Sequence, residues 1–334
     1  MRAHVRGMSL FWVIALLGVA KAGEYAGDFL ELGIGARPEA LGGGTVGVSE
    51  EVGGVVWNPA SLSGLRHTVV WAGYTPLSPL GYWDGYHYLG FAGPFGEAVL
   101  SASWVRLQVT GVPRFPELPG GRRERLQRAQ DLALQGDGVP EGYFSASDDA
   151  LYLTFLKENS FTLDLGWRFF ELPLSLPVGV SVKFLRKSLG DAKGRGVGLD
   201  LGGMVQVELS HLVAHEALGE LCLGLAIQDV GNTMVLWRSR HADRIRWRGC
   251  IGASYYQHFS FGRVLFLWGR EVHCGGRSHW GVEWTKGKVA LRVGYDGERP
   301  RAGVGLGWER FKVDYAIVPR DFGVLHRITG KFLP

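Results

Sequence analysis

After residue 22 the sequence lacks any apolar run that approaches the ~18 residues needed to cross a membrane as a helix. It has only 3 cysteines, and only 20% of its residues are charged. Three cysteines are too few for a disulfide framework, and a soluble protein of this size normally carries more charge on its surface. The sequence therefore favours neither a helical membrane protein nor an ordinary soluble one.

Recognisable catalytic and metal-binding motifs are also missing. The sequence contains no G-x-S-x-G and no H-E-x-x-H. Residues 42–47 satisfy G-x-G-x-x-G, but no strand precedes them, so nucleotide binding is not expected. The scattered histidines and cysteines do not reach four metal ligands with a recognisable spacing. We predict that the chain is not an enzyme and has no cofactor and no metal site.

The charge balance argues against nucleic acid as a partner. The formal net charge of the sequence is +4. Arg2, Arg6 and Lys21 lie in the first 22 residues, which contain no acid, so the remainder carries +1. A chain this close to neutrality has no electrostatic footprint for a polyanion.

Residues 1–22 have the pattern of a secretory signal peptide. A basic start is followed by an apolar run over residues 8–19 and by small residues at 20 and 22, the two cleavage positions. The apolar run is too short to cross ~30 Å of hydrocarbon as a helix. We predict cleavage before Gly23; an uncleaved N-terminal anchor is the alternative.

Most of the chain after residue 66 alternates between apolar and small or polar residues. In residues 161–169, Phe161 and Leu163 share one face, and Thr162 and Asp164 share the other. The same split recurs in residues 220–228, 289–296 and 302–308. Successive side chains of a strand point to opposite faces, so this pattern predicts β-strands of either a membrane barrel or a soluble sandwich.

Strand length and aromatic content favour the barrel. The alternating segments run about 9–12 residues, the length that crosses a membrane at a tilt, whereas average strands have about 5–6. Large aromatic residues lie at the ends of the apolar faces, as a membrane-interface girdle requires: Trp167, Phe169, Tyr255, Trp284, Tyr295 and Trp308. The predicted fold is an all-β transmembrane antiparallel β-barrel.

Residues 23–65 differ from everything that follows. They are rich in glycine and alanine, show no two-residue alternation, and include a helix-compatible run from Ala36 to Leu41. This predicts a compact plug at 23–65, followed by a barrel at 66–334 that is large enough to surround it. The residues that define the plug are Gly35, Ala36, Arg37, Gly42, Gly43, Trp57, Asn58, Pro59 and Ala60.

The plug segment also carries a family resemblance. Residues 29–62, FLELGIGARPEALGGGTVGVSEEVGGVVWNPASL, resemble the opening of the PorV/PorQ family of outer-membrane proteins, relatives of the FadL-type fatty-acid transporters. The shared features are Gly-Ala-Arg, a glycine-rich turn, an acidic pair and Asn-Pro-Ala. Glu50-Glu51 stands where the family usually has Asp-Asp. Residues 313–319 and 325–332 are similar to the family's closing hairpin.

The resemblance implies fourteen strands. Candidate strands begin near residues 66, 86, 96, 148, 160, 175, 195, 219, 245, 259, 277, 288, 301, 311 and 324. This is an odd number, whereas a barrel with both chain ends on one side needs an even one. One candidate between 66 and 170 is therefore not a full crossing. We expect fourteen strands, with sixteen as the alternative, and a long external loop at 108–147.

The predicted inner face mixes glycine with single charges. Such charges can pair across the lumen and stiffen it, or they can line a route for a solute. The lumen-facing candidates are Asp164, Arg168, Lys183, Asp200, Glu220, Glu283 and Arg292. Cys222 and Cys250 are also expected to face the lumen. The sequence leaves open whether these two or Cys274 form a disulfide.

The resemblance implies an outer-membrane protein of a Gram-negative-type bacterium that acts in transport or protein export. One alternative is passive FadL-like transport of hydrophobic small molecules. The other is a structural barrel or type IX secretion scaffold without transport. The implied partners are outer-membrane lipid and either a hydrophobic small molecule or an exported protein.

Overall fold

A computed structural model describes residues 27–77, 84–115, 123–124, 140–164, 166, 171–210, 218–272, 276–321 and 323–334. Within these residues, fourteen antiparallel strands form a closed barrel. The ring closes because β1 pairs with β16, the last strand, and β5 pairs with β6. The strands of the ring are β1 (Val69–Pro76), β2 (Gly85–Phe95), β3 (Ala98–Arg114), β4 (Gly142–Asp164), β5 (Glu171–Leu189), β6 (Ala192–Glu208), β7 (Glu220–Gln228), β10 (Arg248–Phe259), β11 (Gly262–Glu271), β12 (Ser278–Lys286), β13 (Val289–Tyr295), β14 (Pro300–Gly307), β15 (Phe311–Arg320) and β16 (Gly323–Phe332).

A short hairpin extends the sheet at one end of the barrel. It consists of β8 (Thr233–Trp237) and β9 (Ala242–Ile245), and β8 pairs with residues 194–197 of β6 beyond the end of β7. The expected barrel of fourteen strands is confirmed. The sequence pattern gave fifteen candidate strands, one too many, because the segments beginning near 148 and 160 are both parts of the single 23-residue strand β4.

Merging these two candidates also places three of the longer connections at one end. The connections from β3 to β4, from β7 to β10 and from β11 to β12 all join strand ends opposite to the start of β1, whereas the connection from β6 to β7 joins strand ends at the other side. The expected loop 108–147 was too wide, since β3 continues to Arg114 and β4 begins at Gly142. A register shift between Val109 and Val112 lets the ladder continue to Arg114 opposite Gly142.

The strands expose apolar side chains on the outside of the barrel. Leu223, Leu225 and Ile227 of β7 are 49%, 56% and 38% exposed, whereas Gly224 and Ala226 between them are buried. The predicted alternation in residues 289–296 and 302–308 has the same outcome: Val293 and Val304 face outward, and Arg292 and Gly303 face inward. The buried Cys222 and Cys250 are both free, and Cys274 lies outside the described residues.

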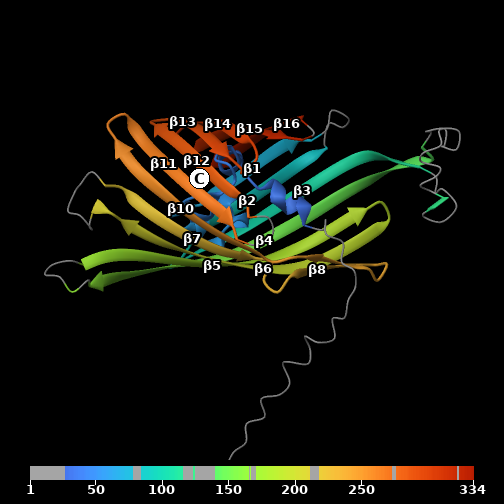
Figure 1. The fold of residues 1–334 in the computed structure, drawn as a ribbon, viewed down its shortest axis with the longest axis horizontal. Coiled ribbons are helices and arrows are strands. Elements are labelled where there is room, and N and C mark those ends of the chain that lie inside the picture. The colour runs from blue at the N-terminus through green and yellow to red at the C-terminus, as the bar shows by residue number, and fades with distance from the viewer. Residues whose placement is uncertain are drawn as a thin grey trace, which may run out of the picture.

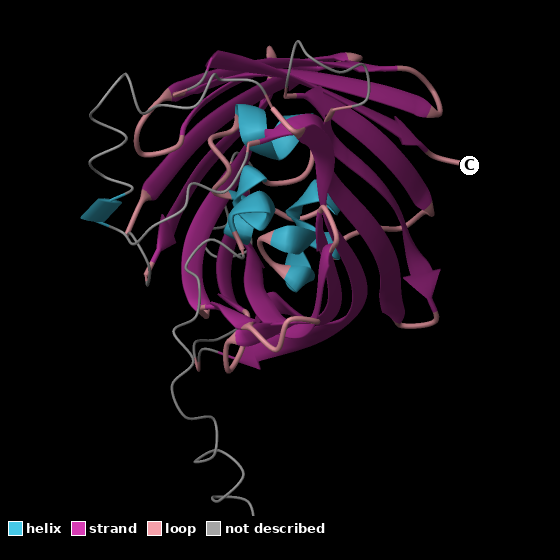
Figure 2. Cartoon of the chain, turned by 90° about the vertical axis from the view of Figure 1, so that its right-hand side faces the viewer, coloured by secondary structure: helices cyan, strands magenta, loops and turns pink. Residues whose placement is uncertain are grey.

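The opening segment lies inside the ring of strands. Figure 2 looks along the barrel and shows short helical turns enclosed by the wall. We call residues 27–65 the plug; its helices are η1 (Asp28–Leu32), α1 (Ala36–Ala40), η2 (Thr45–Gly47), η3 (Val52–Val56) and η4 (Pro59–Leu62). The short helix expected at Ala36 to Leu41 is α1. Among the described residues, no helix has the length and apolar character to cross a membrane.

The outward position of Leu223 can be tested by mutation. We expect Leu223→Arg to reduce assembly of the barrel in membranes, because a cation at the bilayer midplane costs ~2–4 kcal/mol on the lipid face. The measurement is the amount of heat-modifiable protein in the outer-membrane fraction. Trp308→Arg is the control, since Trp308 is exposed just beyond the end of β14 and a cation near the interface costs only ~0–1 kcal/mol. Equal assembly of both variants would contradict the outward assignment of Leu223.

Candidate functional site

The plug lies directly against glycines of the inner wall. A Cβ atom added to Gly224 of β7 would lie 2.1 Å from the carbonyl oxygen of Val46. A Cβ atom added to Gly294 of β13 would lie 2.3 Å from the backbone nitrogen of Gly42. No side chain fits at such distances, so glycine allows the plug backbone to touch the wall. Gly252, Gly269, Gly281 and Gly303 approach the plug in the same way.

Arg37 of α1 joins the plug to the wall through two carboxylates. Its Nη1 donates to Glu51 of the plug at 2.6 Å, and its Nε and Nη2 both donate to Glu283 of β12 at 2.8 Å. Lys331 of β16 lies 3.4 Å from the other oxygen of Glu51. Burial raises the pKa of Glu51, but Lys331, Arg37 and the N–H of Gly53 together lower it to about 2. Glu51 is therefore a carboxylate at neutral pH.

The ion pairs continue along the wall beyond Glu283. Arg292 of β13 contacts Glu283 and also lies 2.8 Å from Asp314 of β15. Asp314 is in turn 3.6 Å from Lys331. A buried charge is tolerated when it is paired, and here each of these buried wall groups has an opposite charge beside it.

Glu39 is the centre of a second set of ion pairs. Its Oε2 lies 2.6 Å from Nη1 of Arg301 on β14, and Arg301 also contacts Asp296. Arg327 of β16 is fully buried, lies 4.0 Å from Glu39, and donates to the carbonyl oxygens of Leu32 and Gly33. We call the inward side of β11–β16 the charged face.

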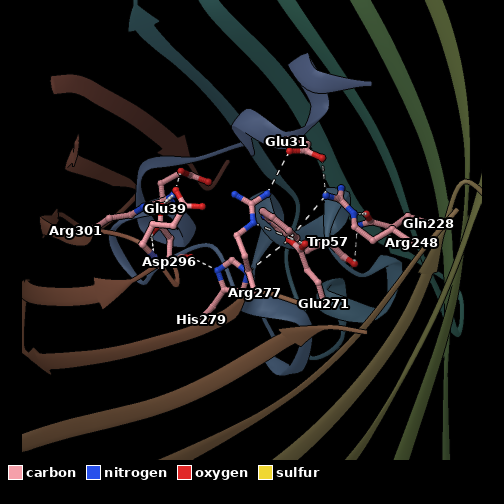
Figure 3. A network of polar contacts seen from close by, with 12 residues as sticks. Glu31, Glu39, Trp57, Gln228, Arg248, Glu271, Arg277, His279, Asp296 and Arg301 are labelled. Atoms are coloured by element: carbon pink, nitrogen blue, oxygen red, sulfur yellow. Dashed lines mark hydrogen bonds and ion pairs between the residues drawn. The ribbon is translucent and has the colours of Figure 1, made fainter. Parts of the chain in front are cut away.

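A third group of polar contacts surrounds the first turn of the plug (Figure 3). Glu31 lies 3.4 Å from both Arg248 of β10 and Arg277. Glu271 of β11 lies 3.6 Å from Nε2 of His279, whose Nδ1 is 2.7 Å from the carbonyl oxygen of Gly42. These contacts fasten residues 31 and 42 of the plug to the same side of the barrel.

The Trp-Asn-Pro-Ala turn is fastened by side-chain amides. Nδ2 of Asn58 donates to the carbonyl oxygen of Val46 at 2.7 Å, and Oδ1 accepts from the N–H of Ala60 at 2.9 Å. Gln228 of β7 donates to the carbonyl oxygens of Val56 and Trp57. Trp57 is 6% exposed, and the guanidinium of Arg248 lies 5.7 Å from its ring centre. The turn is therefore buried and fixed.

The inner wall on the other side of β16 is largely apolar. One buried cluster joins plug residues to the inward side of β1–β4, which we call the apolar face, and it continues to Leu185, Met204 and Val235 of β5, β6 and β8. From the plug it contains Phe29, Ile34, Val52, Val55, Ala60 and Leu62, and from the wall Trp71, Tyr86, Tyr88, Val99, Val105, Ala150, Tyr152 and Leu156. The inward charges of β4, Asp148 and Glu158, lie toward its two ends, outside this cluster.

Two cavities lie at the end of the lumen where β1 begins and β16 ends. The larger has a volume of about 690 Å³ and lies between Ser49 and Glu50 of the plug and the ends of β4–β7 and β10. Its lining includes Phe161, Leu174 and Tyr256. The smaller, of about 390 Å³, lies between the plug and β11–β16. Both share Ser49 and Glu50 of the plug and Tyr256 and Arg263 of the wall, so the two cavities adjoin each other.

Four of the lumen-facing candidates are buried and ion-paired. They are Glu283 and Arg292, described above, and Lys183, whose Nζ lies 2.8 Å from both Asp200 and Asp229; Asp200 is the fourth. Glu220 is half-buried, lines the larger cavity and accepts a hydrogen bond from the thiol of Cys222. Arg168 and the side chain of Asp164 lie outside the described residues.

Several wall residues of the charged face were not among the sequence candidates. Arg301, Asp314, Arg327 and Lys331 all lie inward. A signal was present for Arg301, because it precedes the inward glycines 303, 305 and 307 by steps of two. Nothing in the sequence indicates that Arg301 pairs with Glu39, since the two residues are 262 positions apart.

Comparison with known proteins gives only distant structural likenesses. The toluene transporter TbuX of Ralstonia pickettii is 13% identical, with 90% of this chain and 98% of that chain covered and a TM-score of 0.45. A mutant of the monoaromatic hydrocarbon channel TodX is 11% identical, covers 90% and 97%, and has a TM-score of 0.46. The sequence matches no family model, and it matches no curated protein. The PorV/PorQ resemblance therefore stays a prediction.

The close approach of plug and wall yields a testable pair of variants. We expect Gly294→Val to displace residues 40–42 of the plug, because its Cβ would overlap backbone atoms of Ala40, Leu41 and Gly42. The measurement is pore conductance in planar bilayers, which should rise above that of the wild-type barrel. Gly330→Val is the control, since nothing lies within 4 Å of a Cβ at that position. Unchanged conductance in a correctly assembled Gly294→Val barrel would show that residues 40–42 do not occlude the lumen.

Proposed function

We propose that this chain is an outer-membrane barrel that lets small apolar solutes pass between its plug and the apolar face of its wall. The observation that carries the proposal is the unequal attachment of the plug. Arg37, Glu39 and Glu51 all reach ion pairs on the charged face. Toward β1–β4 the plug presents apolar residues such as Ile34, Val52 and Val55.

The two faces differ in what it costs to separate them from the plug. Removing one partner of a buried ion pair leaves an uncompensated charge and costs about 3–5 kcal/mol. Separating apolar surfaces costs the burial free energy of those surfaces, and an apolar solute that enters the gap restores much of it. The apolar face is therefore the side on which a solute can replace plug contacts. Polar solutes would gain nothing there.

The larger cavity supports passage of a solute toward the end of the barrel where β1 begins. Its volume of about 690 Å³ lies within the ~300–1,000 Å³ range of small-molecule sites. It is lined by Phe161 and Leu174 as well as by polar groups, and it lies at the end opposite to the long connection between β3 and β4. Longer loops are usual at the extracellular end of such barrels, so a solute leaving the plug would reach this cavity before the periplasm.

The outer-membrane location rests on the wall itself. Fourteen strands expose a band of leucine, valine and phenylalanine, and closed barrels with an outward apolar band are the strand architecture that spans membranes. Cleavage of residues 1–22 and membership of the PorV/PorQ family, with its role in protein export, stay predictions from the sequence.

The test is solute uptake by cells or vesicles that contain the barrel, with toluene as the probe. We expect Val105→Trp to reduce uptake several-fold, because Val105 is fully buried in the cluster between plug and apolar face and a larger side chain there fills the route. The measured quantity is the initial rate of uptake of labelled toluene at equal amounts of assembled barrel.

Val293→Trp is the matched control for this test. Val293 is 62% exposed on the outside of β13, so the same substitution adds the same bulk away from the lumen. Uptake by this variant should equal that of the wild type. Two results would overturn the proposal: no uptake above the level of cells without the barrel, or equal uptake by Val105→Trp and the wild type.

A further inference from the structure

The outside of the barrel carries two arginines directly opposite each other, and neither has an acidic partner among the described residues. Arg186 of β5 and Arg195 of β6 are cross-strand neighbours, and both are exposed. Among the residues that the structure describes, no carboxylate lies within ion-pair distance of either one. Like charges directly opposite on a sheet destabilise it. We call Arg186 and Arg195 the arginine pair.

The nearest acid in the same row is already occupied. Asp149 of β4 is the cross-strand neighbour of Arg186. Its carboxylate accepts hydrogen bonds from Nε and Nη2 of Arg106 at 2.7 and 3.1 Å, and from the indole N–H of Trp104 at 3.1 Å. Arg106 thus neutralises Asp149, and the arginine pair keeps two uncompensated positive charges.

The arginine pair lies at the edge of the outward apolar band. On β5, Val178 and Phe184 are 48% and 44% exposed on the face that Arg186 continues. On β6, Leu201 and Val197 are 37% and 60% exposed on the face that Arg195 continues. Phe184 and Val197 are themselves cross-strand neighbours. They are two residues along each strand from the arginine pair, so they occupy the next position on the same face. Both strands therefore change from apolar residues to arginine at the same height.

This level is near the end of the barrel opposite to the start of β1. The turn between β5 and β6 consists of residues 190 and 191, close to the arginine pair, and the β8–β9 hairpin adjoins β6 there. Figure 1 shows β5, β6 and β8 side by side in the wall opposite β13 and β14. Leu236 of β8, the cross-strand neighbour of Arg195, is 63% exposed, so the apolar band reaches the arginine pair from a third strand.

We propose that the arginine pair binds the phosphate group of a lipid headgroup while the apolar residues below it contact the acyl chains. A phosphate placed between the two guanidinium groups would remove their repulsion, and guanidinium groups match phosphate oxygens in geometry. Phe184, Val197 and Leu236 would lie against the first part of the chains. The inference requires that the barrel lies in a membrane, but it does not depend on which solute the lumen passes.

The test is lipid binding by the purified barrel in a neutral detergent, with phosphatidic acid as the probe and diacylglycerol, which has the same acyl chains but no phosphate, as the comparison. We expect the double variant Arg186→Gln and Arg195→Gln to bind phosphatidic acid about 25-fold more weakly than the wild type, since each cation near a membrane surface contributes a factor of about five. Binding of diacylglycerol should not change. Native mass spectrometry gives both affinities.

The matched control removes two positive charges from the other end of the barrel. Lys286 at the end of β12 and Arg310 in the turn before β15 are both exposed. Lys286→Gln with Arg310→Gln should leave phosphatidic acid binding at the wild-type level. An equal loss of phosphatidic acid binding in both double variants would show that only net charge matters. No loss of binding in either variant would show that the arginine pair is not a binding site. Each result overturns the proposal. If the first double variant does not assemble, Arg195→Gln alone should weaken binding about fivefold.

Discussion

The structure depends on the pairing of charges inside a lumen that the plug fills. Arg292, Arg301 and Arg327 are each at most 6% exposed, and a charge buried to this degree is stable only beside an opposite charge or strong hydrogen-bond partners. The plug supplies part of that compensation, because Glu39 lies beside Arg301 and Glu51 lies beside Lys331. Arg37 in return joins Glu51 to Glu283. The charged face and the plug therefore stabilise each other.

The inward glycines make this pairing possible. The side chains of Glu39 and Glu51 reach the wall because the backbone of the plug touches Gly281 and Gly294. The same close contact leaves the apolar side of the plug against Trp71, Tyr86 and Tyr152. One segment of about forty residues is thus held by ion pairs on one side of the barrel and by apolar packing on the other.

Much of the barrel could be predicted from the sequence because its signal is local. Leu223 and Leu225 alternate with Cys222 and Gly224, and this period of two fixes which side chains face outward. The length of β4 could not be predicted, because its 23 residues exceed a single crossing and resemble two strands. The charged face was predicted only in part: Glu283 and Arg292 stood out as lone charges, whereas the pairing of Glu39 with Arg301 depends on residues far apart in the sequence. The apolar face also depends on how β1–β4 curve around the plug.

The plug is fixed to the charged face and is separable from the apolar face. Hydrogen–deuterium exchange of the assembled barrel in detergent, with and without toluene, tests this difference. We expect toluene to change exchange at the amides of residues 52–62, which include Val52 and Val55 of the apolar cluster, and to leave the amides of α1 (Ala36–Ala40) unchanged. Faster exchange in α1, with residues 52–62 unaffected, would contradict it.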